Sequence, residues 1–252
     1  MNPFYTIRSE WIKLSTTKAL MWTTIVFEIL GLLMPGLVGW SANQTEGGFV
    51  DTTLLPFSLY YLGMYAVIIQ SIMVVTSEYR YNGAGVTFTA TPQRILVMLS
   101  KWVLYVTISV VLTFLTLVVG FYFAKLTAGS ELSAQIDVWN DESLLRMMWV
   151  YPLATMLIVT LCMGIGMLVR QTAGAIAIML VWFVGLESGV YFFPKHGPKI
   201  SEHGPFSNLR AFLTQVDLSY PSWDYVGSLY YFIAWAVGFY LLGLFSVWFR
   251  DA

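Results

Sequence analysis

The sequence predicts an all-α integral membrane protein that crosses a bilayer six times, and two observations carry this prediction. First, 58% of its 252 residues are hydrophobic and only 11% are charged, whereas soluble domains carry roughly 25% charged residues. A soluble globule leaves a large share of its residues at the surface, so it could not hide this many apolar side chains. Second, the apolar residues are gathered into long uninterrupted runs.

Six of these runs are long enough to cross a membrane, because a helix needs about 20 apolar residues to span the hydrocarbon core. They cover residues 19–40, 54–76, 102–124, 147–169, 173–193 and 226–249. Only Arg170, Gln171 and Thr172 separate the fourth run from the fifth. We expect a break there, because a buried arginine is unfavourable in lipid. We therefore expect residues 1–252 to form a single transmembrane domain. We also expect a kink at Pro35–Gly36, near the outer end of the first span.

The basic residues favour an orientation with both chain ends in the cytoplasm, since Lys and Arg accumulate on that side of a membrane. This orientation places eight of the 13 basic residues inside. The first 18 residues also lack the apolar core and cleavage site of a signal peptide. We therefore expect the chain to keep its start on the cytoplasmic side.

Two segments outside the spans are predicted to lie at the inner face of the membrane. Residues 3–18 carry apolar side chains at helical spacing among basic ones, which is typical of an amphipathic helix in the interface. A generic anchor beside the first span would look the same. Residues 77–94 form the longest inner connection, with Glu78 and Arg80 at its start and Pro92 and Arg94 at its end. A short helix or turn held by charges at both ends would suit docking of a partner.

The outer connection, residues 194–225, is predicted to contain a short amphipathic helix. Its apolar residues between Phe206 and Val216 follow a helical period, so we expect this helix to lie partly in the outer leaflet. The same connection carries His196 and His203, each followed by Gly-Pro. With Glu202 they could bind a metal, but a site needs three or four arranged ligands and Gly-Pro pairs form turns first. We predict no metal site.

Three polar residues lie inside the predicted spans, namely Glu28, Gln70 and Glu187. An ionisable residue at membrane depth is a functional candidate by default. These residues could line a substrate path that favours a cationic substrate. Alternatively, each carboxyl could be hydrogen-bonded between helices, in its protonated form because burial raises a carboxyl pKa. The two interpretations are balanced for Glu28, whereas the structural one is favoured for Glu187.

The chain lacks the sequence signatures of catalysis. It has no G-x-x-x-x-G-K-[ST] motif for binding ATP, no H-E-x-x-H and no G-x-S-x-G,. No histidine lies within a predicted span. We therefore expect a non-enzyme that binds no cofactor itself. A net charge of -1 also gives no general attraction to nucleic acid,.

In the order and spacing of its elements, nearly the whole chain resembles the permease subunits of type 2 ABC transporters. The likeness is to bacterial members, especially actinobacterial exporters. The resemblance is carried by three segments: the interfacial stretch Arg8-Ser9-Glu10-Trp11-Ile12-Lys13-Leu14, the segment from Glu78-Tyr79-Arg80 to Thr91-Pro92-Gln93-Arg94, and the outer helix Phe206 to Val216. The chain departs from the family at Gly85, where members often carry a basic residue.

The resemblance implies a type 2 ABC exporter fold in a bacterial plasma membrane. It implies two P-loop ATPase subunits that hold ATP and Mg, and a second permease copy or a homologous permease. It also implies that the inner segment couples to the ATPase through Glu78, Tyr79, Arg80, Pro92 and Arg94. The aromatic- and methionine-rich spans favour an amphipathic or hydrophobic substrate, such as a drug, an antimicrobial peptide or a lipid-like molecule. The alternative is a non-transporting sensor or assembly factor that holds a partner with the same inner segment.

Overall fold

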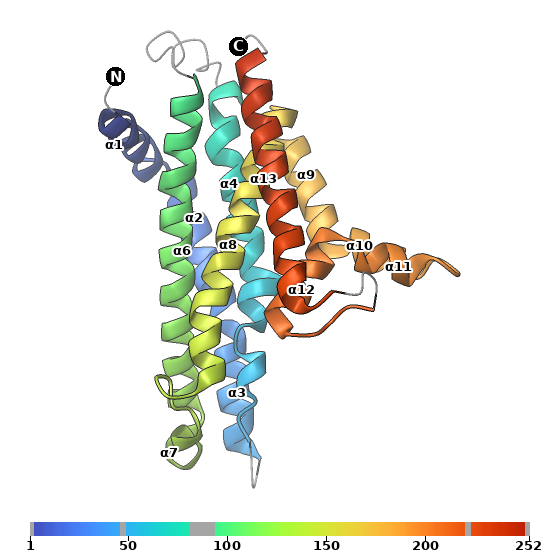
Figure 1. Cartoon of the computed structure of the whole chain (residues 1–252). Helices are drawn as coiled ribbons and strands as arrows, with labels where there is room; N and C mark the ends of the chain where they lie inside the picture. The colour runs from blue at the N-terminus through green and yellow to red at the C-terminus, as the bar shows by residue number, and fades with distance from the viewer. Residues whose placement is uncertain (1–2, 46–48, 81–93, 220–222, 250–252) are drawn as a thin grey trace. The chain divides into compact units, whose positions relative to one another are not determined.

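The computed structural model describes residues 3–45, 49–80, 94–219 and 223–249 (Figure 1). In this part of the chain the secondary structure is helical and contains no strand. Six helical segments within it are long and apolar enough to cross a membrane. They are Lys18–Gln44, Thr52–Ser77, Arg94–Thr127, Glu142–Val169, Thr172–Val190 and Tyr225–Phe249. The prediction of an all-α, multi-pass membrane protein is therefore confirmed at this level.

The described residues form α-helices, two π-helical turns and two short 3₁₀ turns. The α-helices are α1 (Pro3–Ser15), α2 (Lys18–Gly31), α3 (Leu33–Gln44), α4 (Met64–Arg80), α6 (Arg94–Thr127), α7 (Gly129–Leu132), α8 (Glu142–Val169), α9 (Thr172–Val181), α10 (Glu187–Val190), α11 (Gly197–Glu202), α12 (Pro205–Thr214) and α13 (Tyr225–Phe249). The π-helical turns are Leu59–Gly63, before α4, and Trp182–Leu186, which joins α9 to α10. Short 3₁₀ turns cover Thr52–Leu54 and Ser133–Gln135.

The helices coincide with the predicted runs but differ from them at their ends. The third span begins at Arg94, not at residue 102, and α6 has 34 residues. At a rise of 1.5 Å per residue its length is about 51 Å, which exceeds a hydrocarbon core of about 30 Å. The first eight residues of α6, Arg94 to Lys101, belong to the helix, but Ser100 and Lys101 interrupt the apolar run, which is why hydropathy alone placed the start too late. The predicted interfacial helix over residues 3–18 is α1, which ends at Ser15.

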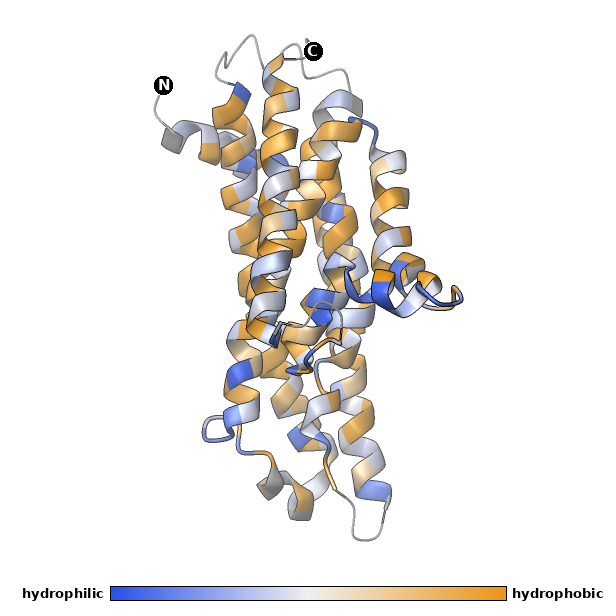
Figure 2. Cartoon of the chain, turned by 45° about the vertical axis from the view of Figure 1, so that its right-hand side comes forward, coloured by the Kyte–Doolittle hydropathy of each residue, from blue (hydrophilic) through white to orange (hydrophobic). Residues whose placement is uncertain are grey.

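The chain divides into two compact units. Unit 1 contains residues Met1–Trp11, Ser71–Tyr105 and Leu157–Ala252. Unit 2 contains Ile12–Gln70 and Val106–Met156. The helices α4, α6 and α8 each contribute residues to both units. Figure 2 shows hydrophobic residues along most of each long helix and hydrophilic residues mainly at helix ends and connections.

In unit 1, α8 and α13 approach each other at two glycines. A Cβ atom added at Gly164 would lie 2.5 Å from the carbonyl carbon of Phe239, and one at Gly243 would lie 2.8 Å from the Gly164 carbonyl oxygen. Small residues allow such backbone contact between helices in a membrane. Within this unit the start of α1 and the end of α13 lie at the same end (Figure 1).

The helix α12 also belongs to unit 1, and here the prediction of an outer-leaflet helix is wrong. The expected amphipathic helix exists as Pro205–Thr214, but eight of its ten residues are buried within the protein. Its apolar face packs on unit 1, with Phe206 5.6 Å from Phe232 of α13 between ring centres. An apolar helical period shows that one face is buried, but it does not distinguish lipid from protein as the covering material.

In unit 2, the first span breaks between α2 and α3. The helix is interrupted at Leu32, three residues before Pro35 and close to the predicted kink. The hydroxyl of Ser58 donates to the carbonyl of Gly31 at 2.9 Å and accepts from the backbone N–H of Met34 at 3.0 Å. These two bonds join the break to the start of the second span.

Candidate functional site

A buried ion pair ties α1 to the third span, α6, in unit 1. The Nζ of Lys101 on α6 lies 2.5 Å from Oε2 of Glu10 on α1, and both side chains are at most 5% exposed. Breaking such a pair leaves an uncompensated buried charge, so the two residues depend on each other. Sequence analysis placed both at the inner side without pairing them, because nothing local connects residues 91 positions apart.

The break between α8 and α9 is organised by Arg170. This residue adopts a left-handed backbone conformation with φ of 55° and ends α8. Its guanidinium donates through Nη2 to the carbonyl of Ser246 on α13 at 3.0 Å. The same group lies 5.2 Å from the centre of the Tyr79 ring on α4, within the range of a cation–π contact,. Arg170 therefore connects three helices, which explains how an arginine is accommodated between two spans.

A second contact joins α4 to the start of α9. The hydroxyls of Thr76, four residues before the end of α4, and Thr172, the first residue of α9, lie 2.8 Å apart. We use the name inner cluster for Glu10, Thr76, Tyr79, Lys101, Arg170, Thr172 and Ser246. Through it, the ends of α4 and α6 that flank residues 81–93 are bonded to α1, α9 and α13.

The predicted coupling residues are described only in part. Glu78, Tyr79 and Arg80 form the last turn of α4, and Arg94 is the first residue of α6. Pro92 lies outside the described residues, as do the side chains of Glu78 and Arg80. Tyr79 is half-buried beneath Arg170. Its contact with Arg170 makes it a member of the inner cluster.

Glu187, in unit 1, is a buried carboxylate that caps α12. It accepts four hydrogen bonds: from Nε1 of Trp182 at 2.9 Å, from the backbone N–H groups of Phe206 at 3.0 Å and Ser207 at 2.6 Å, and from the Ser207 hydroxyl at 2.8 Å. The first N–H groups of a helix lack helical partners and carry partial positive charge. Glu187 satisfies two of them, which supports the structural interpretation. Gly204 leaves room for the carboxylate, because an added Cβ there would overlap it.

Gln70 and Glu28 lie in unit 2, where each joins α2 to another helix. The Thr23 hydroxyl donates to Oε1 of Gln70 at 3.2 Å, and the Thr116 hydroxyl on α6 donates to Oε1 of Glu28 at 2.9 Å. Gln70 is buried, whereas Glu28 is half-buried. The three predicted path residues therefore have separate partners. Of these three, Glu28 is the residue whose side chain keeps a partly open surface.

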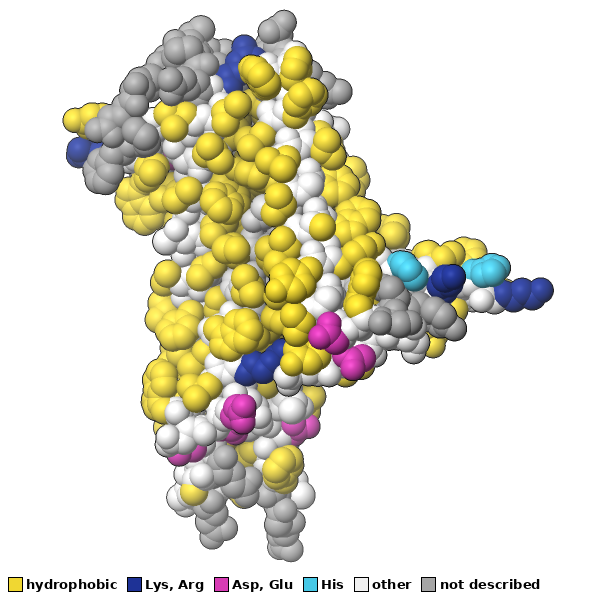
Figure 3. All heavy atoms as spheres, viewed as in Figure 1, with side chains coloured by type: hydrophobic (Ala, Val, Ile, Leu, Met, Phe, Trp, Pro, Cys, Tyr) yellow, Lys and Arg dark blue, Asp and Glu magenta, His cyan; other side chains and the backbone are white. Residues whose placement is uncertain are grey.

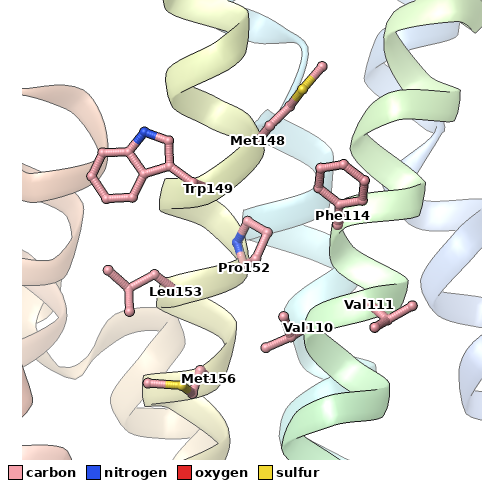
Figure 4. Close-up of a pocket in the computed structure, with 8 residues that line it drawn as sticks. All are labelled: Val110, Val111, Phe114, Met148, Trp149, Pro152, Leu153 and Met156. Atoms are coloured by element: carbon pink, nitrogen blue, oxygen red, sulfur yellow. The ribbon is translucent and has the colours of Figure 1, made fainter.

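An apolar groove on unit 2 was not predicted from the sequence. It lies between α6 and α8, as Figure 4 shows, and has a volume of about 400 Å³. Its lining is Val110, Val111, Phe114, Met148, Trp149, Pro152, Leu153 and Met156. Apolar and aromatic linings are typical of sites for hydrophobic molecules. Such residues occur throughout the spans, so no local signal marked these eight.

Comparison of the sequence with protein-family models gives no match, and comparison with curated proteins gives none either. Among the described residues, no group of three or more His, Cys, Asp or Glu side chains is placed to hold a metal ion. Three features of the described residues bear on function: the inner cluster, the half-buried Glu28 and the apolar groove.

Proposed function

We propose that the chain is the membrane-spanning permease subunit of an ATP-driven ABC exporter in a bacterial plasma membrane. The observation that carries this proposal is the inner cluster. It bonds the two helix ends that flank residues 81–93 to an interfacial helix, α1, and to the α8–α9 connection. If an ATPase moves residues 81–93, the bonds of the inner cluster can transmit this movement to the spans.

The energy would come from two separate ATPase subunits, which hold ATP and Mg, since the chain has no P-loop motif,. Movement of the inner segment would pull on α4 through Glu78, Tyr79 and Arg80. Tyr79 and Thr76 would pass it to the α8–α9 connection, and Lys101 would pass movement of α6 to α1. Closely packed helices move as rigid bodies. Displacement of the inner end of a span would therefore also move the part of that span that faces the substrate path.

A second permease copy, or a homologous permease, would cover part of the fifth span, Thr172–Val190. Gly185 and Gly189 form a small-xxx-small pair, and a Cβ added at either would meet no atom within 4 Å. Ala173 and Ala177 form a similar pair and are exposed. In the most apolar stretch of this span only 17% of the residues are buried, compared with 78% for α8. These small residues are not used for packing inside the chain, which leaves them available to a partner.

The substrate would be amphipathic or hydrophobic. The apolar groove between α6 and α8 offers aromatic and thioether contacts, and these suit a drug, a lipid-like molecule or the apolar face of a peptide,. Glu28 would add a polar contact that favours a cationic group. The alternative function, a non-transporting sensor or assembly factor, would use the inner segment to hold a partner without a substrate path.

The proposal is tested by purifying the tagged chain from native membranes in mild detergent and identifying co-purifying proteins by mass spectrometry. We expect a stoichiometric P-loop ATPase, which is lost when residues 81–93 are replaced by a Gly-Ser linker of equal length. A matched variant with substitutions in the other outer connection, between α6 and α8, Ala134→Ser and Ser133→Ala, should keep the ATPase. A preparation without an ATPase, under conditions that preserve a known ABC complex, would overturn the permease function and favour the alternative.

A further inference from the structure

A cluster of exposed aromatic residues follows the end of the fifth span, where the outer connection begins. We use the name outer arm for residues 191–203, which contain α11 and lie in unit 1. Tyr191 is 53% exposed, Phe192 84%, Phe193 63% and Ile200 56%. Four large apolar side chains this close together are unfavourable in water, because moving apolar surface out of water lowers the free energy. The arm therefore needs a covering surface.

The outer arm is held in place by backbone contacts. The Gly197 N–H donates to the Phe193 carbonyl at 3.0 Å, and the Ile200 N–H donates to the His196 carbonyl at 3.0 Å. The hydroxyl of Tyr231 on α13 donates to the carbonyl of His203 at 2.9 Å and so fixes the far end of the arm. Any side chain at Gly197 would press on the Val190 carbonyl, 2.6 Å from an added Cβ. The aromatic side chains are thus presented on a defined turn.

The exposed apolar surface of the arm continues the surface of the fifth span. The preceding helical turns expose Ile178, Val181, Val184 and Leu186, each between 49% and 60%. These side chains lie on a segment long and apolar enough to cross a membrane, so the apolar surface runs at membrane depth up to the arm,. Phe192 and Phe193 follow directly after this segment.

Basic residues begin where the aromatic residues end. Lys195, His196, Lys199 and His203 are all exposed, and Glu202 is the one acid in the arm's sequence. Figure 3 shows these basic and histidine side chains beside hydrophobic ones on the arm. Aromatic rings at the edge of the hydrocarbon, with lysines reaching to the phosphates, are the usual pattern at a membrane interface.

We propose that the outer arm is a lipid-binding anchor in the headgroup region of the outer leaflet. Phe192 and Phe193 enter the acyl chains, and Lys195 and Lys199 contact the phosphates of anionic phospholipid. A protein that covered the whole arm would have to desolvate both lysines, whereas a phospholipid surface satisfies the rings and the charges together. This inference does not depend on the proposed permease function.

The test uses the full chain with one spin label at a time, reconstituted in vesicles of phosphatidylcholine and phosphatidylglycerol. Cys162 is the single cysteine, and it is buried, so a Cys162→Ala background allows labelling at chosen positions. Labels are placed through Phe192→Cys, Phe193→Cys and Lys195→Cys, with Ala134→Cys in the other outer connection as the aqueous control. Accessibility of each label to oxygen and to a water-soluble nickel chelate is then measured.

We expect labels at positions 192 and 193 to be several-fold more accessible to oxygen than to nickel, and labels at 195 and 134 to show the reverse. Nickel accessibility at 192 and 193 equal to that at 134 would place the arm in water and overturn the anchor. Labels at 192 and 193 shielded from both reagents would indicate coverage by protein, including a second copy of this chain, and would also overturn it.

The lipid class is tested with the label at position 192 in vesicles with and without phosphatidylglycerol. We expect the anionic lipid to shift this label deeper, and Lys195→Gln with Lys199→Gln to remove the shift without changing insertion of the protein. An equal depth in both vesicle types, or a shift that survives the double substitution, would contradict phosphate binding by these lysines.

Discussion

The hydroxyl of Ser58 donates to the carbonyl of Gly31, the carbonyl that Pro35 leaves without a helical partner. In an uninterrupted helix the N–H four residues later would bond to this oxygen, but proline has no N–H. Ser58 is fully buried, and its oxygen also accepts from the N–H of Met34 at 3.0 Å. One side chain thereby satisfies both sides of the break, as a broken helix in lipid requires.

Replacing Ser58 with alanine should destabilise the protein by about 1–3 kcal/mol, because it leaves a buried backbone acceptor and donor without partners. The measurement is reversible unfolding in mixed micelles. The matched control is Pro35→Ala, which restores a backbone N–H that can bond to the Gly31 carbonyl. We expect the cost of Ser58→Ala to be smaller in the Pro35→Ala background. Equal costs in both backgrounds would show that the proline does not explain the role of Ser58.

The Glu10–Lys101 pair should be sensitive to loss of one partner and more tolerant of losing both. Glu10→Gln leaves the Lys101 ammonium buried without its carboxylate, which should cost about 3–5 kcal/mol. Glu10→Leu combined with Lys101→Met removes both charges and should recover most of this stability. Unfolding of the three variants in micelles measures the difference. If the single and double variants are equally stable, the pair does not hold α1 to α6.

Glu187→Ala should loosen the start of α12, because the N–H groups of Phe206 and Ser207 lose their acceptor. Amide hydrogen exchange of the peptide that covers residues 205–214 should become at least tenfold faster. Ala134→Ser, an exposed substitution in the connection between α6 and α8, is the control and should leave this exchange unchanged. Unaltered exchange in Glu187→Ala would mean that the capping bonds contribute nothing to the order of α12.

The double substitution Glu78→Arg and Arg80→Glu reverses both charges and tests coupling to the ATPase. This prediction rests on the proposed permease function. In vesicles that contain the permease and its ATPase, we expect ATP hydrolysis to continue while transport falls several-fold, with the chain still inserted. Transport at the unaltered rate would argue strongly against a coupling role for this turn of α4. Arg170→Ala should have a similar but smaller effect, since it removes the contacts to Tyr79 and Ser246 further from the partner.

The number of spans was predictable from the sequence because each span is a local property. A run of about 20 apolar residues must be a helix in lipid, whatever its neighbours are. The break at Arg170 and the break near Pro35 were predictable for the same reason, since a charge or a missing N–H acts on its own helix. Helix ends were less predictable: α6 begins at Arg94, before Ser100 and Lys101, the two polar residues that interrupt the apolar run.

The partners of the polar residues were decided by the tertiary structure alone. Glu10 pairs with Lys101, 91 positions away in the sequence, and Glu187 accepts hydrogen bonds from the start of α12, about 20 positions later. The tertiary structure also determines which apolar segment of the outer connection is buried in the protein. The helix α12 is buried, whereas the aromatic residues of the outer arm are exposed. Hydrophobicity drives a residue out of water without specifying lipid or protein as its destination. The destination depends on which helices meet, and that depends on contacts between residues far apart in the chain.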